Sequence, residues 1–330
     1  GDADMDLQLI RQRLQALDPR ERISIWTMKK ISRGAVGFIR AYLILCLSFV
    51  VLYPLFYMLS ISFRPNTQIM DPSVIWIPRT FSIQSIVEVM ELIEFPKALS
   101  NSVFLSLAAT LLQLMTCSLA GYGFARFRFR GRNLLFGFVL LTILVPMQSV
   151  AIPMYSQIRF FDYFFVGRLI GLFTGEALST SLYNTPWALF LPALLGNGLR
   201  GGLYIYVFRQ SYMGMPKDLE DAAYIDGCGF IQTYTRIIMP LARAPMLVVF
   251  ILSLIWYWND VFLNNLFYST AETLSMAVDG LAVKMALSHD FYQIFAYQQA
   301  GCLVLIAPVL LMYLFLQKYF IRSVDRTGLK

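Results

Sequence analysis

Charged side chains are scarce in this sequence. Only 14% of the 330 residues are Asp, Glu, Lys or Arg, whereas 58% are hydrophobic, and the mean hydropathy is +0.60. A soluble globular protein carries about 25% charged residues. The composition is therefore typical of a protein that crosses the membrane several times and argues against a soluble enzyme or binding module.

Reactive and metal-binding side chains are also few. The four cysteines are scattered without any C-x-x-C pair, three of them in apolar runs, so the spacing supports neither a zinc site nor a disulfide framework. The single histidine, His289, is expected in a loop without a catalytic partner. We therefore expect no catalytic residues and no metal site.

A nucleotide-binding loop is missing as well. A P-loop requires the pattern G-x-x-x-x-G-K-[ST], and the sequence contains no Gly-Lys step. We therefore expect this chain to bind no cofactor. If ATP and Mg²⁺ power its activity, they bind to another chain.

Six apolar stretches are long enough to span a hydrocarbon core of ~30 Å, which requires about 20 residues of helix. They cover residues 41–63, 98–125, 133–158, 184–208, 244–268 and 291–317. The sequence thus predicts an all-α polytopic membrane protein with a transmembrane domain over residues 36–320. An N-terminal tail, 1–35, would place Leu7, Ile10 and Leu14 against lipid, and residues 321–330 form a C-terminal tail.

The net charge of +7 is unevenly distributed. Most of the 27 Lys and Arg lie in four segments, 1–40, 126–132, 209–243 and 318–330. By the positive-inside rule these segments are expected to be cytoplasmic. Both termini then lie on the cytoplasmic side of a bacterial-type cell membrane. Residues 64–97, 159–183 and 269–290 are then outside. Topology accounts for the positive charge, so no nucleic-acid partner is expected.

The longest polar run in the second half of the chain is PKDLEDAAYIDGCGFIQTYTRIIMP, residues 216–240. Pro216 suits the first turn of a helix, and the acids Asp218, Glu220 and Asp221 suit its positive end. Gly227 and Gly229 can supply the positive φ that stops a helix.

A second short helix is expected from Phe230, Tyr234, Ile237 and Ile238, which recur at helical spacing and precede a terminating Pro240. We interpret these two short helices at a bend as a docking element that fits a groove on another protein. The alternative is an ordinary amphipathic loop between two spans.

Two polar clusters lie within the predicted spans. Asn197, Arg200 and Tyr204 stand among several glycines, and broken helix in lipid is tolerated only around protein or a water-filled cavity. A charged residue there is costly and usually functional. The alternative is that Arg200 reaches an interface or pairs with an acid on a partner subunit.

The second cluster is Trp256, Tyr257, Asn259 and Asp260. Aromatic faces stack on sugar rings, while amides and carboxylates bond to hydroxyl groups, so this cluster suits an oligosaccharide path. An aromatic belt at the outer interface is the alternative.

The polar segment resembles the coupling-loop signature of binding-protein-dependent ABC importer permeases. That signature runs Glu-Ala-Ala, three residues, Gly, nine residues, Ile, one residue, Leu-Pro. This chain has Asp221-Ala222-Ala223, Gly227, Ile237 and Met239-Pro240. It departs from the pattern with Asp at 221 and Met at 239, which keep the charge and the apolar volume.

A wider resemblance covers residues 36–330 and is to the maltose-type sugar permeases, specifically the smaller six-span subunit. It is carried by YPLFYMLSISFRP (53–65), NSVFLSLAATLLQLMTCSLAGYGFARFRFRGR (101–132), VPMQSVAIPMY (145–155), WALFLPAL (187–194), WND (258–260) and QKYF (317–320). Residues 159–183 look longer than the family usually shows.

The resemblance implies a type I importer permease in the lipid bilayer. Its partners would be a second homologous permease, two ATPase subunits and an extracytoplasmic solute-binding protein, and its cargo a sugar. The residues implied in ATPase coupling are Glu220, Asp221, Ala222, Ala223, Asp226, Gly227, Ile237 and Pro240. The substrate path would include Asn197, Arg200, Tyr204, Trp256, Tyr257, Asn259 and Asp260.

Three alternatives remain at this stage. A permease of the same fold could carry a peptide or amino acid, although few charged residues line the predicted cavity. An ion-driven secondary transporter predicts paired intramembrane acids or inverted repeats, and the sequence shows one such acid, Asp260, and no repeat. A membrane-embedded enzyme requires a nucleophile–base or metal-ligand set, and no such set is found.

Overall fold

The computed structural model describes residues 19–69, 71–74, 76–174, 179–286 and 290–327. The predicted lipid-facing residues of the N-terminal tail and His289 lie outside these ranges. The chain divides into two compact units, residues 1–60 and 61–330. Within the described part, secondary structure is helical apart from one antiparallel bridge between Phe161 and Thr180, which confirms the predicted all-α class.

The first unit holds most of helix α2, Pro19–Ser62. From Val36 to Val51 its large apolar side chains are exposed. Such a helix suits a hydrocarbon surrounding, because it satisfies its backbone polar groups internally.

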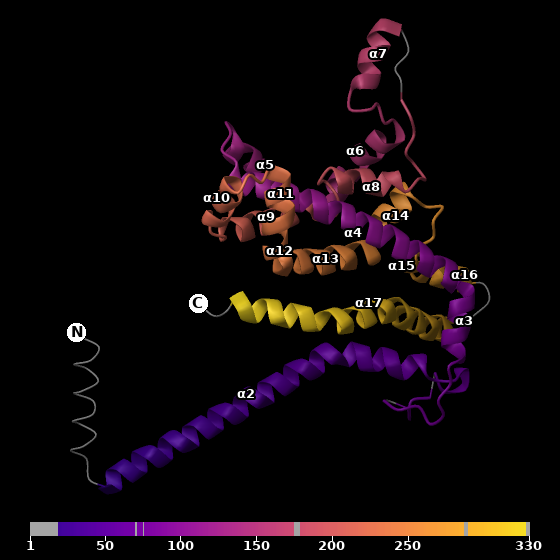
Figure 1. Ribbon diagram of the computed structural model, residues 1–330. Coiled ribbons are helices and arrows are strands. Elements are labelled where there is room, and N and C mark those ends of the chain that lie inside the picture. The colour runs from indigo at the N-terminus through magenta and orange to yellow at the C-terminus, as the bar shows by residue number, and fades with distance from the viewer. Residues whose placement is uncertain (1–18, 70, 75, 175–178, 287–289, 328–330) are drawn as a thin grey trace. The chain divides into compact units, whose positions relative to one another are not determined.

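Helix α4 (Phe95–Arg126) is the central element of the second unit. It packs against α8 (Trp187–Leu194), α9 (Gly201–Met213), α13 (Arg243–Trp258) and α15 (Leu274–Asp279), as Figure 1 shows. Its buried face is built largely from small residues, namely Ala98, Ser102, Ser106, Ala109, Ser118 and Gly121. Small residues let helix backbones approach closely in a membrane.

Helices α4 and α9 approach each other closely at Gly121. A Cβ at this position would overlap the Cβ of Phe208 and lie 3.0 Å from the backbone nitrogen of Arg209. The glycine therefore sets the distance between the two helices.

Several predicted spans are broken. Residues 133–158 form α5 (Arg132–Leu144) and α6 (Met147–Arg159), bent by 108°. The break falls at Val145, which is extended (φ −73°, ψ 120°) because the following Pro146 disfavours helical backbone before it. Residues 184–208 are divided between α8 and α9, and residues 244–268 between α13 and α14 (Phe262–Phe267).

Within the described residues, three helices are long and apolar enough to cross a membrane, Ala35–Ser62, Phe95–Arg126 and Phe291–Lys318. Counting each bent pair as one span, α5 with α6 and Phe230–Leu241 with α13, gives up to five. The six predicted span boundaries therefore stay a prediction.

The other helices are short, except for the last. They are η1 (Asn66–Gln68), α3 (Gln84–Leu92), α7 (Val166–Thr174), α10 (Asp218–Ile225), α11 (Phe230–Thr233), the π-helix η2 (Tyr234–Ile238), α12 (Met239–Leu241), α16 (Leu281–Met285) and α17 (Phe291–Thr327). Helix α3 packs on α17, where Tyr297 donates a hydrogen bond to Glu88.

The close approach of α4 and α9 can be tested with two glycines of one helix. We expect Gly121→Ala to destabilise the folded protein by about 1–3 kcal/mol, because an added methyl group overpacks a closed contact. Gly123→Ala is the matched control, since its Cβ would meet only the Phe127 ring at 3.9 Å. Thermal aggregation of the purified protein in detergent would measure both variants, and equal midpoints would contradict the contact.

Candidate functional site

The segment 216–240 forms the predicted pair of short helices. Helix α10 begins at Asp218, two residues after Pro216, and ends before a turn at Gly227, where φ is +83°. The predicted positive φ is thus confirmed at Gly227. It is wrong at Gly229, which is extended (φ −74°, ψ 168°) and donates its N–H to Gln232 Oε1 at 3.3 Å, opening α11.

The second short helix continues past its expected end. Residues 230–241 run through α11, η2 and α12, so Pro240 lies inside the helical run rather than closing it. Proline cannot donate a backbone hydrogen bond, and the wider π-helical turn directly before it accommodates the missing bond.

A buried ion pair ties this segment to the end of α4. The Nε of Arg126 lies 2.5 Å from Oε1 of Glu220, and both side chains are less than a tenth exposed. Tyr122 donates its hydroxyl proton to Oε2 of Glu220 at 3.1 Å, and an Arg126 terminal nitrogen donates to the Met215 carbonyl at 2.9 Å. The Glu220 carboxylate therefore faces α4 and does not lie on the outer face of the segment.

Aromatic side chains extend this connection. The Tyr122 ring packs against Tyr212, Phe230 and Tyr234, with ring centroids 5.2–5.7 Å apart. The Ser118 hydroxyl bonds to the hydroxyls of Tyr212 (2.6 Å) and Tyr234 (2.7 Å). The coupling segment, α4 and α9 thus share one buried cluster.

The opposite face of the segment is exposed and partly apolar. Ile225 is 86% exposed and Ile231 is 71% exposed. The remaining predicted coupling residues divide between the two faces: Asp221, Ala222, Asp226 and Gly227 are exposed, Ile237 and Pro240 are half-buried, and Ala223 is buried. Exposed apolar patches bordered by polar residues mark interaction sites.

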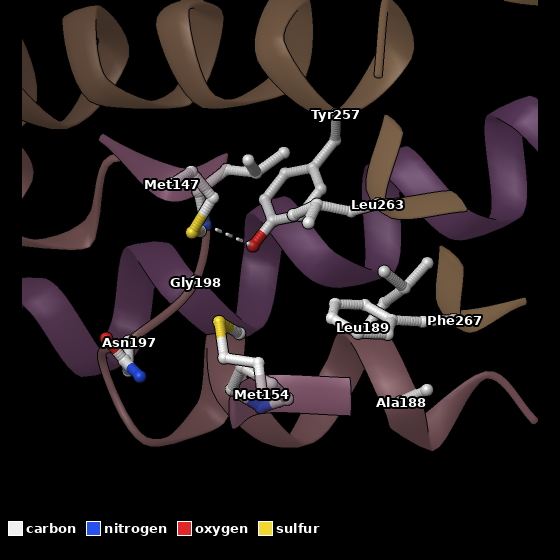
Figure 2. A pocket seen from close by; sticks show the side chains of 11 residues that line it. Met147, Met154, Ala188, Leu189, Asn197, Gly198, Tyr257, Leu263 and Phe267 are labelled. Carbon is white, nitrogen blue, oxygen red and sulfur yellow. Dashed lines mark hydrogen bonds between the residues drawn. The ribbon is translucent and has the colours of Figure 1, made fainter. Parts of the chain in front are cut away.

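Part of the predicted substrate path is used for internal bonding. Figure 2 shows Tyr257 reaching from α13 toward the turn that precedes α9. The buried Tyr257 hydroxyl donates to Gln113 Oε1 at 2.6 Å and accepts from the Leu199 nitrogen at 3.2 Å, while Gln113 Nε2 donates to the Leu199 carbonyl at 2.7 Å. Sequence reasoning missed Gln113, although a single amide in the apolar run 102–118 was a visible signal.

Two further predicted residues are also turned inward. Tyr204 is fully buried. Asp260 accepts the backbone N–H groups of Leu263 (3.3 Å) and Asn264 (2.9 Å), and so caps the start of α14. Burial and capping explain these positions without a ligand.

The other predicted path residues are exposed. The Arg200 guanidinium carbon lies 4.4 Å from the centroid of the Trp256 ring, a cation–π contact. Arg200 itself adopts φ +59° directly before α9. Asn259 donates to the Ile255 carbonyl at 2.9 Å, and Asn197 lines a small cavity of about 10 Å³ together with Tyr257 (Figure 2).

Comparison with known proteins decides the family. Residues 117–326 match the family described as binding-protein-dependent transport system inner membrane component. The chain belongs to this family. It is therefore an integral inner-membrane permease subunit of a binding-protein-dependent importer, and the predicted resemblance is confirmed. This family consists of membrane components of transporters and not of enzymes.

Relatives cover most of the chain. It is 28% identical to the arabinooligosaccharides transport system permease protein AraQ of Halalkalibacterium halodurans, over 86% of this chain and 93% of AraQ. It is 27% identical to the lactose transport system permease protein LacG of Rhizobium radiobacter (84% and 90%). Against the osmoprotective compounds uptake permease protein GgtD of Synechocystis sp. the identity is 25% (85% and 88%).

The fold also matches a solved structure. A bacterial ABC transporter involved in the import of the acidic polysaccharide alginate contains a chain that aligns with a TM-score of 0.68. The alignment covers 88% of this chain and 98% of that chain at 20% sequence identity. The permease thus has the type I ABC importer fold.

The buried ion pair predicts a specific loss of stability. We expect Glu220→Gln to cost about 3–5 kcal/mol, because it leaves Arg126 charged and buried without its counterion. The double variant Glu220→Gln with Arg126→Gln should recover most of this loss, whereas the exposed Asp221→Asn should cost little. Thermal aggregation in detergent measures all three, and an additive double variant would contradict the pairing.

The two glycines of the coupling segment offer a matched test of the turn. An added Cβ meets nothing within 4 Å at either position, so Gly227→Ala and Gly229→Ala differ in backbone conformation alone. Left-handed backbone costs an L-residue about 1–2 kcal/mol, so hydrogen exchange of the α10 amides should become about 5- to 30-fold faster in Gly227→Ala. Gly229→Ala should leave these amides nearly unchanged, and equal rates would contradict the turn.

Proposed function

We propose that this permease carries a sugar or oligosaccharide, delivered by an extracytoplasmic binding protein, and is driven by separate ATPase subunits that bind ATP and Mg²⁺. It would work as a heterodimer with a second homologous permease. Both termini and the segment 216–240 would face the cytoplasm, in agreement with the distribution of Lys and Arg.

The observation that carries the coupling proposal is the two-faced character of the segment. Its inner face is fixed to α4 by the ion pair of Arg126 and Glu220. Its outer face presents Asp221 and Ala222 beside the exposed Ile225 and Ile231. A segment that is fixed to α4 on one side and exposes apolar and acidic residues on the other is suited to bind a partner and to transmit its movement to α4.

The transport cycle then follows from this attachment. When the ATPases close on ATP, they carry α10 to α12 with them, and α4 and α9 follow because they share the buried cluster. The proposed path between the two permeases would then open outward and accept the cargo, and hydrolysis would reset the subunit toward the cytoplasm. ATP acts as the ligand that biases an equilibrium between two states.

The sugar cargo is supported by the names of the relatives AraQ and LacG and by the exposed Arg200–Trp256 pair. An aromatic face can stack on a sugar ring, and a guanidinium donates to hydroxyl oxygens. A second candidate cargo is a small non-sugar solute, because GgtD is named for osmoprotective compounds.

Purification from the native membrane in gentle detergent tests the assembly. We expect an ATPase and a second permease to be retained with this chain and identified by mass spectrometry. Reconstituted with its binding protein, the complex should import radiolabelled oligosaccharide in an ATP-dependent manner. Import of an amino acid or a peptide instead of a sugar would overturn the proposed cargo.

Two exposed acids of one helix test the coupling face. We expect Asp221→Arg to lower ATP-driven uptake and substrate-stimulated ATP hydrolysis at least about tenfold, because a reversed charge at a desolvated contact costs more than 1.4 kcal/mol. Asp218→Arg is the control, since it makes the same change of charge in the same first helical turn but lies outside the signature. Equal losses in both variants would exclude a specific contact at Asp221.

A further inference from the structure

A larger cavity lies beside the segment that connects α6 to α8. Its volume is about 410 Å³, within the range of about 300–1,000 Å³ that is usual for small-molecule sites. Its walls come from the end of α6, from residues 160–168 and from α8. Figure 1 shows the connecting segment extending away from α6 and α8, with α7 at its far end.

Aromatic rings dominate one part of this cavity. They belong to Phe160, Phe161, Phe164, Phe165 and Trp187. Trp187 is 54% exposed, so part of its side chain is accessible to a ligand. Aromatic faces are apolar and can pack against the C–H groups on one face of a ligand ring.

The chain holds two of these rings with strained backbone. Tyr163, Phe164 and Phe165 have φ values of 54°, 59° and 70°, which L-residues rarely adopt. Asp162 supports the turn by accepting the Phe165 N–H at 3.2 Å, and the bridge between Phe161 and Thr180 closes its base. Strained conformations persist where the surroundings enforce them and gather at ligand clamps.

Polar groups converge on the same cavity without adding net charge. Oδ2 of Asp162 lies 3.0 Å from Nε of Arg168, so these charges compensate each other. Gln157 and Asn197 supply neutral amides. Asn197 also lines the small cavity beside Tyr257, so one side chain borders both spaces.

We propose that this cavity is a saccharide-binding subsite for a neutral sugar ring, formed by α6, α8 and the segment between them. The inference rests on the proposed sugar cargo and extends the predicted path, which it meets at Asn197, to residues of α6, α8 and the segment between them. Trp187 and the phenylalanine rings stack on the ring faces, while Gln157, Asn197 and the Asp162–Arg168 pair bond to the hydroxyl groups. An acyl chain would leave those polar groups without partners, at a cost, and an acidic sugar would find its counterion already occupied.

The test uses the complete transporter in nanodiscs, with neutral maltotriose and xylotetraose and the acidic trigalacturonate as probes. Saturation-transfer NMR reports sugar protons in contact with the protein, and uptake assays give KM and kcat. We expect Trp187→Ala and Gln157→Ala each to raise KM for a neutral probe about five- to tenfold with little change in kcat. Trp187→Phe should keep most of the affinity, because it retains a ring face.

Phe173→Ala serves as the control, since this α7 side chain is 90% exposed and does not line the cavity. Basal ATP hydrolysis should be equal in all variants, which shows that each complex is assembled. If the unmodified complex imports a neutral probe but Trp187→Ala and Gln157→Ala keep the same KM and NMR contacts, the subsite is overturned and the proposed function stands. If the unmodified complex binds and imports none of the sugars, both proposals are overturned.

Discussion

The ion pair between Arg126 and Glu220 is the constraint on which the arrangement of the coupling segment depends. Two charges removed from water require each other, since either alone would remain unsolvated. Tyr122 and the Met215 carbonyl complete the bonding. If α10 moved away from the end of α4, Arg126 or Glu220 would lose its buried counterion, which is costly. The coupling segment and α4 are therefore expected to move together.

Helix α4 connects the coupling segment to the rest of the molecule. Near its middle, Gln113 bonds to Tyr257 of α13 and to Leu199 in the turn before α9. Near its C-terminal end, Gly121 brings α9 into backbone contact. The turn that holds Arg200 and the helix that holds Trp256 are thus both anchored to α4, the helix to which the coupling segment is attached. In the proposed cycle, contiguous rigid packing carries the displacement, and no separate signalling route is required.

Local features of the sequence predicted much of this structure. The all-α class, the two short helices and the positive φ of Gly227 followed from composition, helical spacing and backbone sterics. The inward position of Glu220 did not, because its partner Arg126 lies 94 positions earlier and periodicity carries no information on such pairs. For the same reason Tyr257 was predicted to line the path, whereas its hydroxyl bonds to Gln113. Pro146 could have predicted the break before it. The continuous hydrophobicity of residues 133–158 led instead to the prediction of a single span.

Each ionisable group along the proposed path already contacts other residues of this chain, and one of these contacts bears on cargo selection. Arg200 is stacked on Trp256, Asp260 is bonded to the start of α14, and Arg168 is paired with Asp162. Of these groups, Arg168 has its counterion in Asp162, so an acidic solute in that cavity would give up its hydration without gaining a free counterion. A neutral polyhydroxy compound loses less, since it meets aromatic faces and amides that match its own surfaces. In the proposed subsite, the pairing of Arg168 with Asp162 would therefore favour neutral sugars as much as the aromatic rings do.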